Sequence, residues 1–163
     1  MKIAVCSDIH DNLDALDRAL VGMKEAGAEA LLFCGDLNAP FTLKALAEGF
    51  EGAVHTVWGN NDGDQWLITE IAHAVDNVTL HGVFADLEFD GYRVAVVHYP
   101  HLGRALARSD YYDLVCYGHD HESHHERVGE TLLLNPGELM GRFDPPTYAI
   151  VDTTTGKVEV REA

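Results

Sequence analysis

The sequence predicts an α/β (α+β) fold, a four-layer αββα sandwich in which two mixed β-sheets pack together and helices cover their outer faces. Three observations support it. Strands and helices alternate in the first half of the chain, hairpin signals appear in the second half, and several strands are apolar throughout. With 163 residues, 47% of them hydrophobic and 23% charged, the chain has the composition of a single globular domain covering residues 1–163.

The first half is expected to contain parallel strands joined by helices. The expected elements are strand 2–7, helix 12–26, strand 30–34, helix 42–50, strand 53–57 and helix 64–74. Apolar residues at spacings of three and four define the first helix, and Gly27 is placed to end it. In the last helix of this half we expect Trp66, Ile68 and Ile71 to face inward.

The second half is richer in strands. Strands 84–89 and 92–97 flank Asp90-Gly91, a strong hairpin signal. A short helix is expected at 101–109, followed by strands 114–117 and 128–134. A final hairpin joins strands 148–152 and 158–161 around Thr155-Gly156.

Polar residues that could bind metal follow the apolar strands of both halves. They are Asp8, His10, Asp36, Asn60, His98, His119 and His121. In extended backbone the side chains of Asp8 and His10, two residues apart, point the same way. Ligands bind at the carboxyl ends of strands in open α/β sheets. Seven donors are more than one ion needs, so the pattern favours two ions that share a carboxylate.

These residues form an ordered series of motifs that resembles the calcineurin-like metallophosphoesterases, in particular their small single-domain bacterial and archaeal phosphodiesterases. The motifs are Asp8-Ile9-His10, Gly35-Asp36, Gly59-Asn60-Asn61-Asp62, His98 and Gly118-His119-Asp120-His121. Asn135-Pro136-Gly137 also fits that group, so the resemblance covers most of the chain.

The resemblance implies a ligand set for each of two divalent ions. One ion would take Asp8, His10, Asp36 and His121, and the other would take Asp36, Asn60, His98 and His119. Asp36 would bridge them, and Asp36, Asn60 and His98 are the expected catalytic residues. Oxygen and imidazole donors without thiolate favour Mn²⁺, Ni²⁺, Fe²⁺, Zn²⁺ or Co²⁺ over Mg²⁺ and Ca²⁺, and the family makes Mn²⁺ the first choice.

The implied activity is hydrolysis of small phosphodiesters, with a metal-bridging hydroxide attacking phosphorus in line with the leaving oxygen. Three departures from the family pattern bear on it. Asn61 stands where protein phosphatases of the family often have a histidine that acts as general acid. Tyr99 replaces a common glycine and could narrow the site or stack on a substrate ring. Glu138 replaces a common serine, and near the metals its charge would favour diesters over dianionic monoesters.

Four further residues are expected in contact with substrate or with the ligands: Asn12, Asn61, Asp62 and Tyr99. Asn12 precedes the first helix, so a helix N-cap and a phosphate contact are equal alternatives. Asp62 is expected to orient a ligand from behind.

Other functions remain open. Some proteins of this fold are scaffolds, and the retromer scaffold subunit resembles this group but has lost part of the ligand set. Here all seven positions hold competent residues, which favours an enzyme over an inert metal-binding scaffold, while a phosphomonoesterase is a further alternative.

Charge and hydropathy limit the partners. A net charge of −16, from 27 acidic and 11 basic residues, argues against long nucleic acid. No apolar run approaches a membrane span, and the N-terminal run is interpreted as a strand, so we expect a cytoplasmic protein without membrane contact. Small members of the family often self-associate, so a homo-oligomer is also considered.

Overall fold

The computed structural model describes all 163 residues and contains two β-sheets. The first sheet has six strands in the order β11-β10-β1-β2-β3-β4. These strands are β1 (Lys2–Cys6), β2 (Ala30–Phe33), β3 (Ala53–Thr56), β4 (Val78–Leu80), β10 (Thr147–Asp152) and β11 (Lys157–Glu162). Strands β1 to β4 run parallel, and β10 pairs antiparallel with both β1 and β11.

The second sheet has five strands in the order β5-β6-β7-β9-β8. They are β5 (Phe84–Phe89), β6 (Tyr92–Val97), β7 (Leu114–Cys116), β8 (His124–Val128) and β9 (Thr131–Asn135). Its three central strands β6, β7 and β9 are parallel, and the edge strands β5 and β8 are antiparallel to their neighbours. Both sheets are therefore mixed, as predicted.

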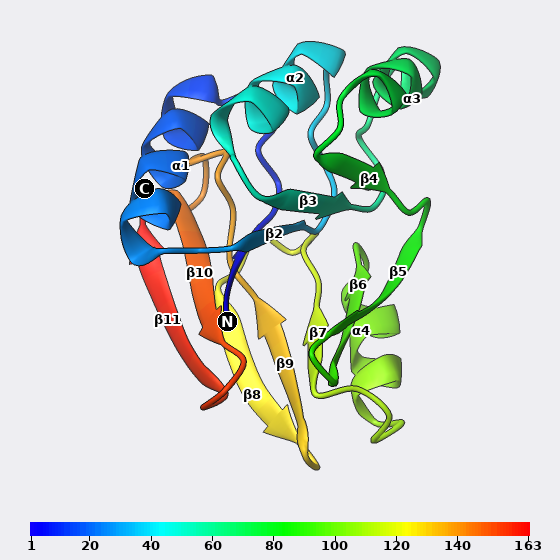
Figure 1. Cartoon of the computed structure of the whole chain (residues 1–163), viewed down its shortest axis with the longest axis vertical. Coiled ribbons are helices and arrows are strands. Elements are labelled where there is room, and N and C mark those ends of the chain that lie inside the picture. Colours follow the sequence, from blue (N-terminus) through cyan, green and yellow to red (C-terminus); the bar gives the residue numbers. More distant parts are fainter.

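Helices cover the outer face of each sheet (Figure 1). The first sheet carries α1 (Leu13–Ala26), α2 (Pro40–Gly49) and α3 (Gln65–Ala74), and the second carries α4 (Pro100–Ala107). Gly27 ends α1 in the left-handed conformation, with φ of 74°.

Three hydrophobic clusters separate the four layers. The cluster between the sheets joins Ile3 and Val5 of β1 to Val94 and Val96 of β6. A larger cluster packs α1, α2 and α3 on the first sheet, and a smaller one packs α4 on the second. The predicted αββα sandwich is confirmed.

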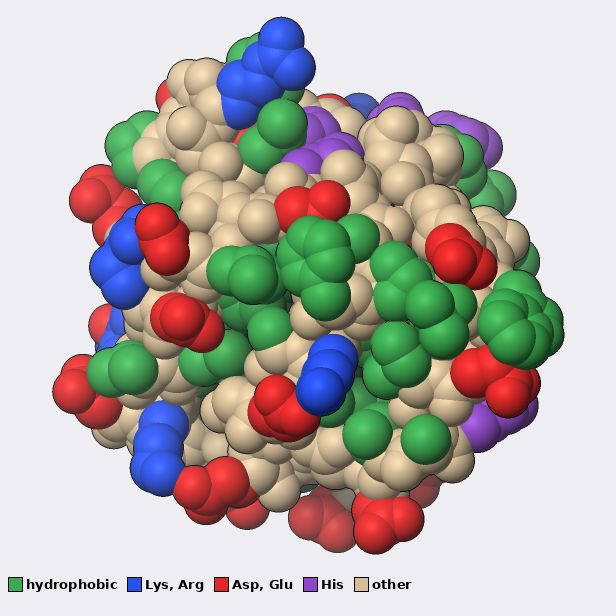
Figure 2. Space-filling model, turned by 90° about the horizontal axis from the view of Figure 1, so that it is seen from above, with side chains coloured by type: hydrophobic (Ala, Val, Ile, Leu, Met, Phe, Trp, Pro, Cys, Tyr) green, Lys and Arg blue, Asp and Glu red, His purple; other side chains and the backbone are tan.

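Three local features differ from the sequence prediction. β4 and the edge strand β8 were not expected, and β8 (His124–Val128) has no apolar alternation to mark it. Trp66 was expected in the core, but it lies in the first turn of α3 with 73% of its surface exposed. Figure 2 shows the molecule from above the view of Figure 1, and hydrophobic side chains lie across the middle of the face seen there. No helix is both long and apolar enough to cross a membrane.

Candidate metal centre

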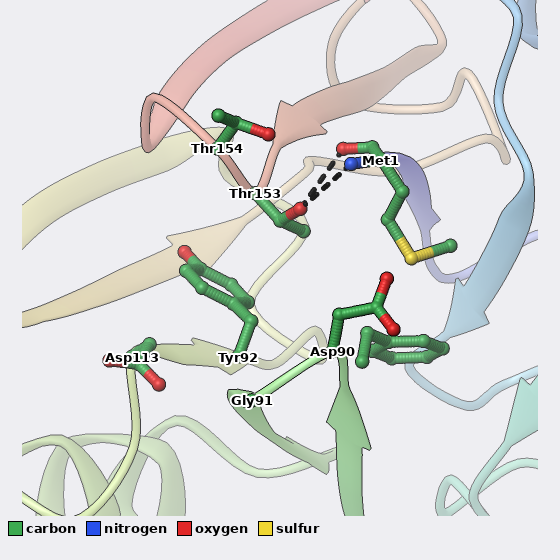
Figure 3. A pocket seen from close by; sticks show the side chains of 8 residues that line it. Met1, Asp90, Gly91, Tyr92, Asp113, Thr153 and Thr154 are labelled. Atoms are coloured by element: carbon green, nitrogen blue, oxygen red, sulfur yellow. Dashed lines mark hydrogen bonds between the residues drawn. The ribbon is translucent and has the colours of Figure 1, made fainter.

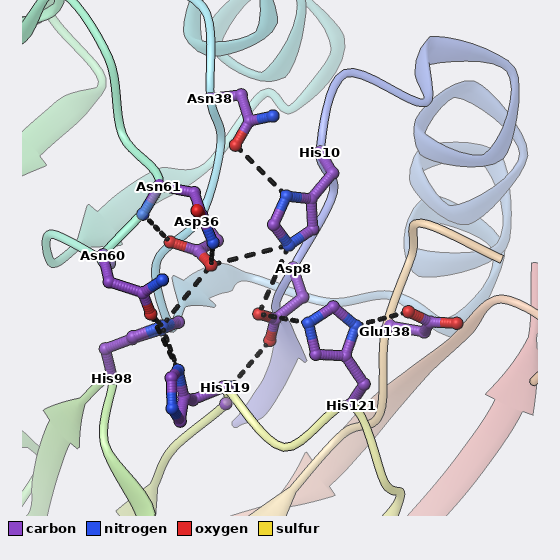
Figure 4. Close-up of polar contacts among 12 residues, drawn as sticks. Asp8, His10, Asp36, Asn38, Asn60, Asn61, His98, His119, His121 and Glu138 are labelled. Atoms are coloured by element: carbon purple, nitrogen blue, oxygen red, sulfur yellow. Dashed lines mark hydrogen bonds and ion pairs between the residues drawn. The ribbon is translucent and has the colours of Figure 1, made fainter. Parts of the chain in front are cut away.

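The candidate site lies where loops that follow the parallel strands of both sheets meet (Figure 4). Asp8 and His10 follow β1, Asp36 follows β2, and Asn60 follows β3. From the second sheet, His98 follows β6, while His119 and His121 follow β7. The structure thus brings all seven residues expected as ligands to one edge of the sandwich.

Asp8 and His10 lie close together, but their backbone is not extended as predicted. β1 ends at Cys6, and both residues adopt left-handed backbone conformations, with φ of 52° and 44°. Asp36, His119 and His121 do the same, with φ of 64°, 78° and 63°. Asp, Asn and His tolerate this region better than other non-glycine residues, and such strain gathers at functional sites. The expected proximity is correct, but the strand alternation given as its reason is wrong.

The donors of the first set lie close to one another in pairs. His10 Nε2 lies 3.8 Å from Asp8 Oδ1 and 3.5 Å from Asp36 Oδ2, and His121 Nε2 lies 3.5 Å from Asp8 Oδ1. Donors of one tetrahedral ion bound at about 2.1 Å lie roughly 3.4 Å apart. The ligand atoms of Asp8, His10 and His121 all lie within 4.8 Å of one another and fit a single ion, and Asp36 approaches this group at His10.

The second set of donors lies on the other side of Asp36. His98 Nε2 is 3.5 Å from Asp36 Oδ2 and 2.9 Å from Asn60 Oδ1. His119 Nδ1 is 2.7 Å from Asn60 Oδ1 and 3.3 Å from His98 Nε2. Because Asp36 Oδ2 lies 3.5 Å from both His10 Nε2 and His98 Nε2, Asp36 is placed to serve two ions. Asp8 also groups both with His10 and His121 and with Asp36 and His98.

Three of the four histidines are oriented by an acceptor at Nδ1. His98 Nδ1 donates to the Cys34 carbonyl oxygen at 2.8 Å, and His10 Nδ1 donates to Asn38 Oδ1 at 3.1 Å. His121 Nδ1 contacts the Glu138 carboxylate. With Nδ1 held in this way, Nε2 of each ring faces the acidic residues, as in metal-binding histidines.

Burial and charge at the site favour bound cations. Asp8 and Asp36 are buried, at 0% and 1% exposure, and neither forms an ion pair with Lys or Arg. Asp8 Oδ1 and His10 Nε2 are buried without hydrogen-bond partners. Unpaired buried carboxylates are costly, and divalent cations would remove that cost. The residues present therefore fit a metal centre.

The local field also shifts the pKa values of Asp8 and His10. Burial acts to raise the pKa of Asp8, but the nearby polar groups of His10 and Ser7 and the hydrogen bond from the His119 backbone N–H outweigh it, so the pKa is lowered. Burial acts to lower the pKa of His10, but the neighbouring Asp8 and Asp36 outweigh it and raise the pKa. Asp8 thus remains a carboxylate.

The four residues expected around the ligands take distinct positions. Asn61 donates to both oxygens of Asp36, at 2.8 Å each. Asp62 accepts from the backbone N–H groups of Asp36, Asn38 and Gly59, so it fastens the loops after β2 and β3. Both thus support a ligand from behind.

Asn12 and Tyr99 flank the site. Asn12 caps α1 by accepting from Ala15 N at 3.1 Å, and its amide donates to the Met140 carbonyl oxygen at 2.9 Å. The N-cap interpretation is confirmed. The Tyr99 ring lies edge-on to His98 and His119, with ring centroids 5.2 and 4.9 Å apart. Tyr99 therefore borders the second set of donors.

The position of Glu138 does not support a preference for diesters. Its carboxylate sits behind the His121 ring, on the side away from Asp8 (Figure 4). Burial acts to raise the pKa of Glu138, but His121 and the backbone N–H groups of Phe143 and Asp144 outweigh it and lower the pKa. The expected repulsion of a second substrate anion by Glu138 loses its basis.

Sequence reasoning missed two partners of the histidines. Asn38 orients His10 and itself adopts a left-handed conformation, with φ of 78°, two residues after Asp36. Glu138 was noticed, but nothing in its motif indicated contact with His121.

A separate hollow lined by Met1, Tyr92 and Thr153 lies at the opposite, N-terminal ends of β1 and β6 (Figure 3). The Met1 amino group donates there to Thr153 Oγ1 at 3.1 Å.

Known proteins are similar to this chain over almost its whole length. Phosphodiesterase MJ0936 of Methanocaldococcus jannaschii is 32% identical over 99% of this chain and 98% of its own. Phosphodiesterase YfcE of Escherichia coli K12 is 28% identical over 93% and 88%. A solved structure described as a novel archaeal phosphodiesterase superposes with a TM-score of 0.91, at 28% identity, and covers all of both chains.

A family model described as the calcineurin-like phosphoesterase superfamily domain matches residues 1–156. Together with the relative that is 32% identical across nearly both full chains, this match shows that the chain belongs to the calcineurin-like phosphoesterase superfamily.

Proposed function

We propose that this chain is a dinuclear-metal phosphodiesterase that hydrolyses small phosphodiesters. The observation that carries the proposal is the pair of buried carboxylates, Asp8 and Asp36, surrounded by four histidines and Asn60 with no Lys or Arg partner. The names of the relatives support the diester substrate. Oxygen and imidazole donors without thiolate favour Mn²⁺, Ni²⁺, Fe²⁺, Zn²⁺ or Co²⁺, and the resemblance to the family makes Mn²⁺ the first choice.

Each residue has a defined task in this proposal. Asp8, His10, Asp36 and His121 would hold one ion, and Asp36, Asn60, His98 and His119 the other. When bound, two such ions generate a nucleophile from water near neutral pH and neutralise phosphoryl oxygens. Asn61 holds the Asp36 carboxylate through a hydrogen bond to each of its oxygens. Tyr99, beside His98 and His119, would border the leaving group or a substrate ring.

We also propose a cytoplasmic location, a small substrate and self-association. Three free cysteines, Cys6, Cys34 and Cys116, fit the reducing cytoplasm. The excess of 27 acidic over 11 basic residues argues for a small substrate over long nucleic acid. Exposed Phe41 and Trp66, at 52% and 73%, offer apolar surface for self-association, which light scattering after size-exclusion chromatography would measure.

A hydrolysis screen tests the proposed activity. Aryl phosphodiesters and monoesters are offered to the protein in Mn²⁺ and separately in Ni²⁺, with His119→Ala and Asp36→Asn as inactive controls. We expect diesters to be hydrolysed faster than monoesters and both variants to be inactive. A protein that binds metal but hydrolyses no ester would be a scaffold. Faster monoester hydrolysis would make it a phosphomonoesterase, and full activity of either variant would refute the dinuclear mechanism.

A further inference from the structure

Glu138 is a fully buried carboxylate that touches the candidate metal centre only through His121. It follows β9, its side chain has 0% exposure, and its ion-pair partner is His121. A buried carboxylate must be hydrogen-bonded to be tolerated, so its partners identify its role.

The two oxygens of Glu138 have separate partners. Oε2 contacts His121 Nδ1. Oε1 accepts from three consecutive backbone N–H groups, those of Arg142 at 2.9 Å, Phe143 at 2.7 Å and Asp144 at 3.2 Å. One carboxylate thus joins a candidate metal ligand to the loop that contains residues 142–144.

The loop that contains residues 142–144 also contacts His121. The Phe143 ring meets the His121 ring edge-on, with centroids 5.4 Å apart. The His121 ring also stacks on the His10 ring, with centroids 5.2 Å apart and an interplanar angle of 19°. Glu138 therefore fixes His121 directly at Nδ1 and indirectly through the side chain that packs against its ring.

We propose that Glu138 is a positioning residue that holds His121 as the Nδ1–H tautomer, so that an unprotonated Nε2 faces Asp8. Nε2 lies 3.5 Å from Asp8 Oδ1, and only an unprotonated nitrogen there can bind a cation. The effect on metal affinity rests on the proposed dinuclear centre, whereas the tautomer is a property of the metal-free chain.

The tautomer is measured first in the wild-type protein. Long-range ¹H–¹⁵N correlation spectra of the full chain with chelator show which ring nitrogens of His121 carry a proton. The His121→Asn spectrum identifies the signal. We expect His121 to be protonated at Nδ1. Protonation at Nε2 would overturn the proposal without any variant of Glu138.

Glu138→Gln then separates positioning from simple charge. A glutamine has one acceptor oxygen, so either His121 or the three amides lose their partner. We expect a mixture of His121 tautomers and a loss of affinity of about 10–100-fold for one Mn²⁺, measured by calorimetry. Glu70→Gln removes the same charge from the exposed face of α3 and should change neither readout.

The outcomes distinguish this inference from the proposed function. A folded Glu138→Gln protein with the native tautomer and native affinity would refute the role of Glu138. If the wild-type protein binds no Mn²⁺, the dinuclear centre fails, and the tautomer still decides whether Glu138 positions His121. If Glu138→Gln does not fold, the wild-type tautomer alone decides.

Discussion

Asn61 donates one hydrogen bond to each oxygen of the Asp36 carboxylate. Its backbone N–H reaches Oδ1 at 2.8 Å, and its side-chain amide reaches Oδ2 at 2.8 Å. Asp36 Oδ2 also lies 3.5 Å from both His10 Nε2 and His98 Nε2. Asn61 therefore sets the orientation of the carboxylate that would be shared by two ions.

Asn61→Ala tests this orientation. The backbone hydrogen bond remains, but Oδ2 loses its amide donor, and we expect Mn²⁺ affinity to fall by about 10–100-fold. Isothermal titration calorimetry measures the change, and Gln65→Ala, which removes an exposed amide from α3, should leave it unaffected. Unchanged affinity in Asn61→Ala would mean that the side-chain amide does not orient Asp36.

Asn61 also predicts how the rate depends on the leaving group. An amide cannot act as a general acid, so departing alkoxides receive no proton from this position. Across a series of aryl and alkyl methyl phosphodiesters, the rate should fall steeply as the pKa of the leaving group rises. A flat dependence, with chemistry shown to limit the rate, would reveal a proton donor elsewhere.

Gly59 leaves room for Asp36. A Cβ at Gly59 would lie 2.0 Å from Asp36 Oδ1 and 2.4 Å from Asp36 N, whereas at Gly63 the nearest atom would be 3.6 Å away. Gly59→Ala should lower the free energy of unfolding by about 1–3 kcal/mol and weaken Mn²⁺ binding. Gly63→Ala should stay within about 0.5 kcal/mol. Urea denaturation and calorimetry compare the two, and equal behaviour would contradict the close packing.

His55 and His81 predict a pH dependence away from the metal centre. His55 Nδ1 lies 3.0 Å from His81 Nε2. Burial lowers both pKa values below 6.5, and His81 lowers that of His55 further. The unfolded chain therefore binds more protons than the folded one below pH 6.5, so this pair reduces the free energy of unfolding as pH falls.

The pair is tested by urea denaturation with chelator between about pH 5 and 7.5. The double variant His55→Gln/His81→Gln should show a flatter dependence on pH than the wild type, while the exposed His125→Gln should match the wild type. A double variant as steep as the wild type would show that other groups cause the dependence.

The sequence predicted most of the fold because its strands and helices carry strong patterns. Apolar runs and hairpin turns such as Asp90-Gly91 placed nine of the eleven strands. β8 was missed because four of its five residues, His124 to Arg127, are polar and exposed at a sheet edge. Trp66 was misplaced because helical periodicity marks a helix but not how far its first turn extends beyond the core.

The candidate site was predictable as a set of residues but not as a geometry. The seven donors follow apolar strands, and parallel strands bring their carboxyl ends together. Left-handed backbone at Asp8 and His10, and the contacts of Asn38 and Glu138 with histidines, depend on loops distant in sequence. No local pattern encodes those contacts, so the sequence could not show that Glu138 contacts His121.

The number of metal ions bound per chain tests the central claim most directly. Calorimetric titration with Mn²⁺, checked by elemental analysis after dialysis, is applied to the wild type, to Asp36→Asn and to the exposed Asp17→Asn. The shared position of Asp36 predicts two ions in the wild type and in Asp17→Asn, and at most one tightly bound ion in Asp36→Asn. A single ion in the wild type, or two tightly bound ions in Asp36→Asn, would contradict the dinuclear centre.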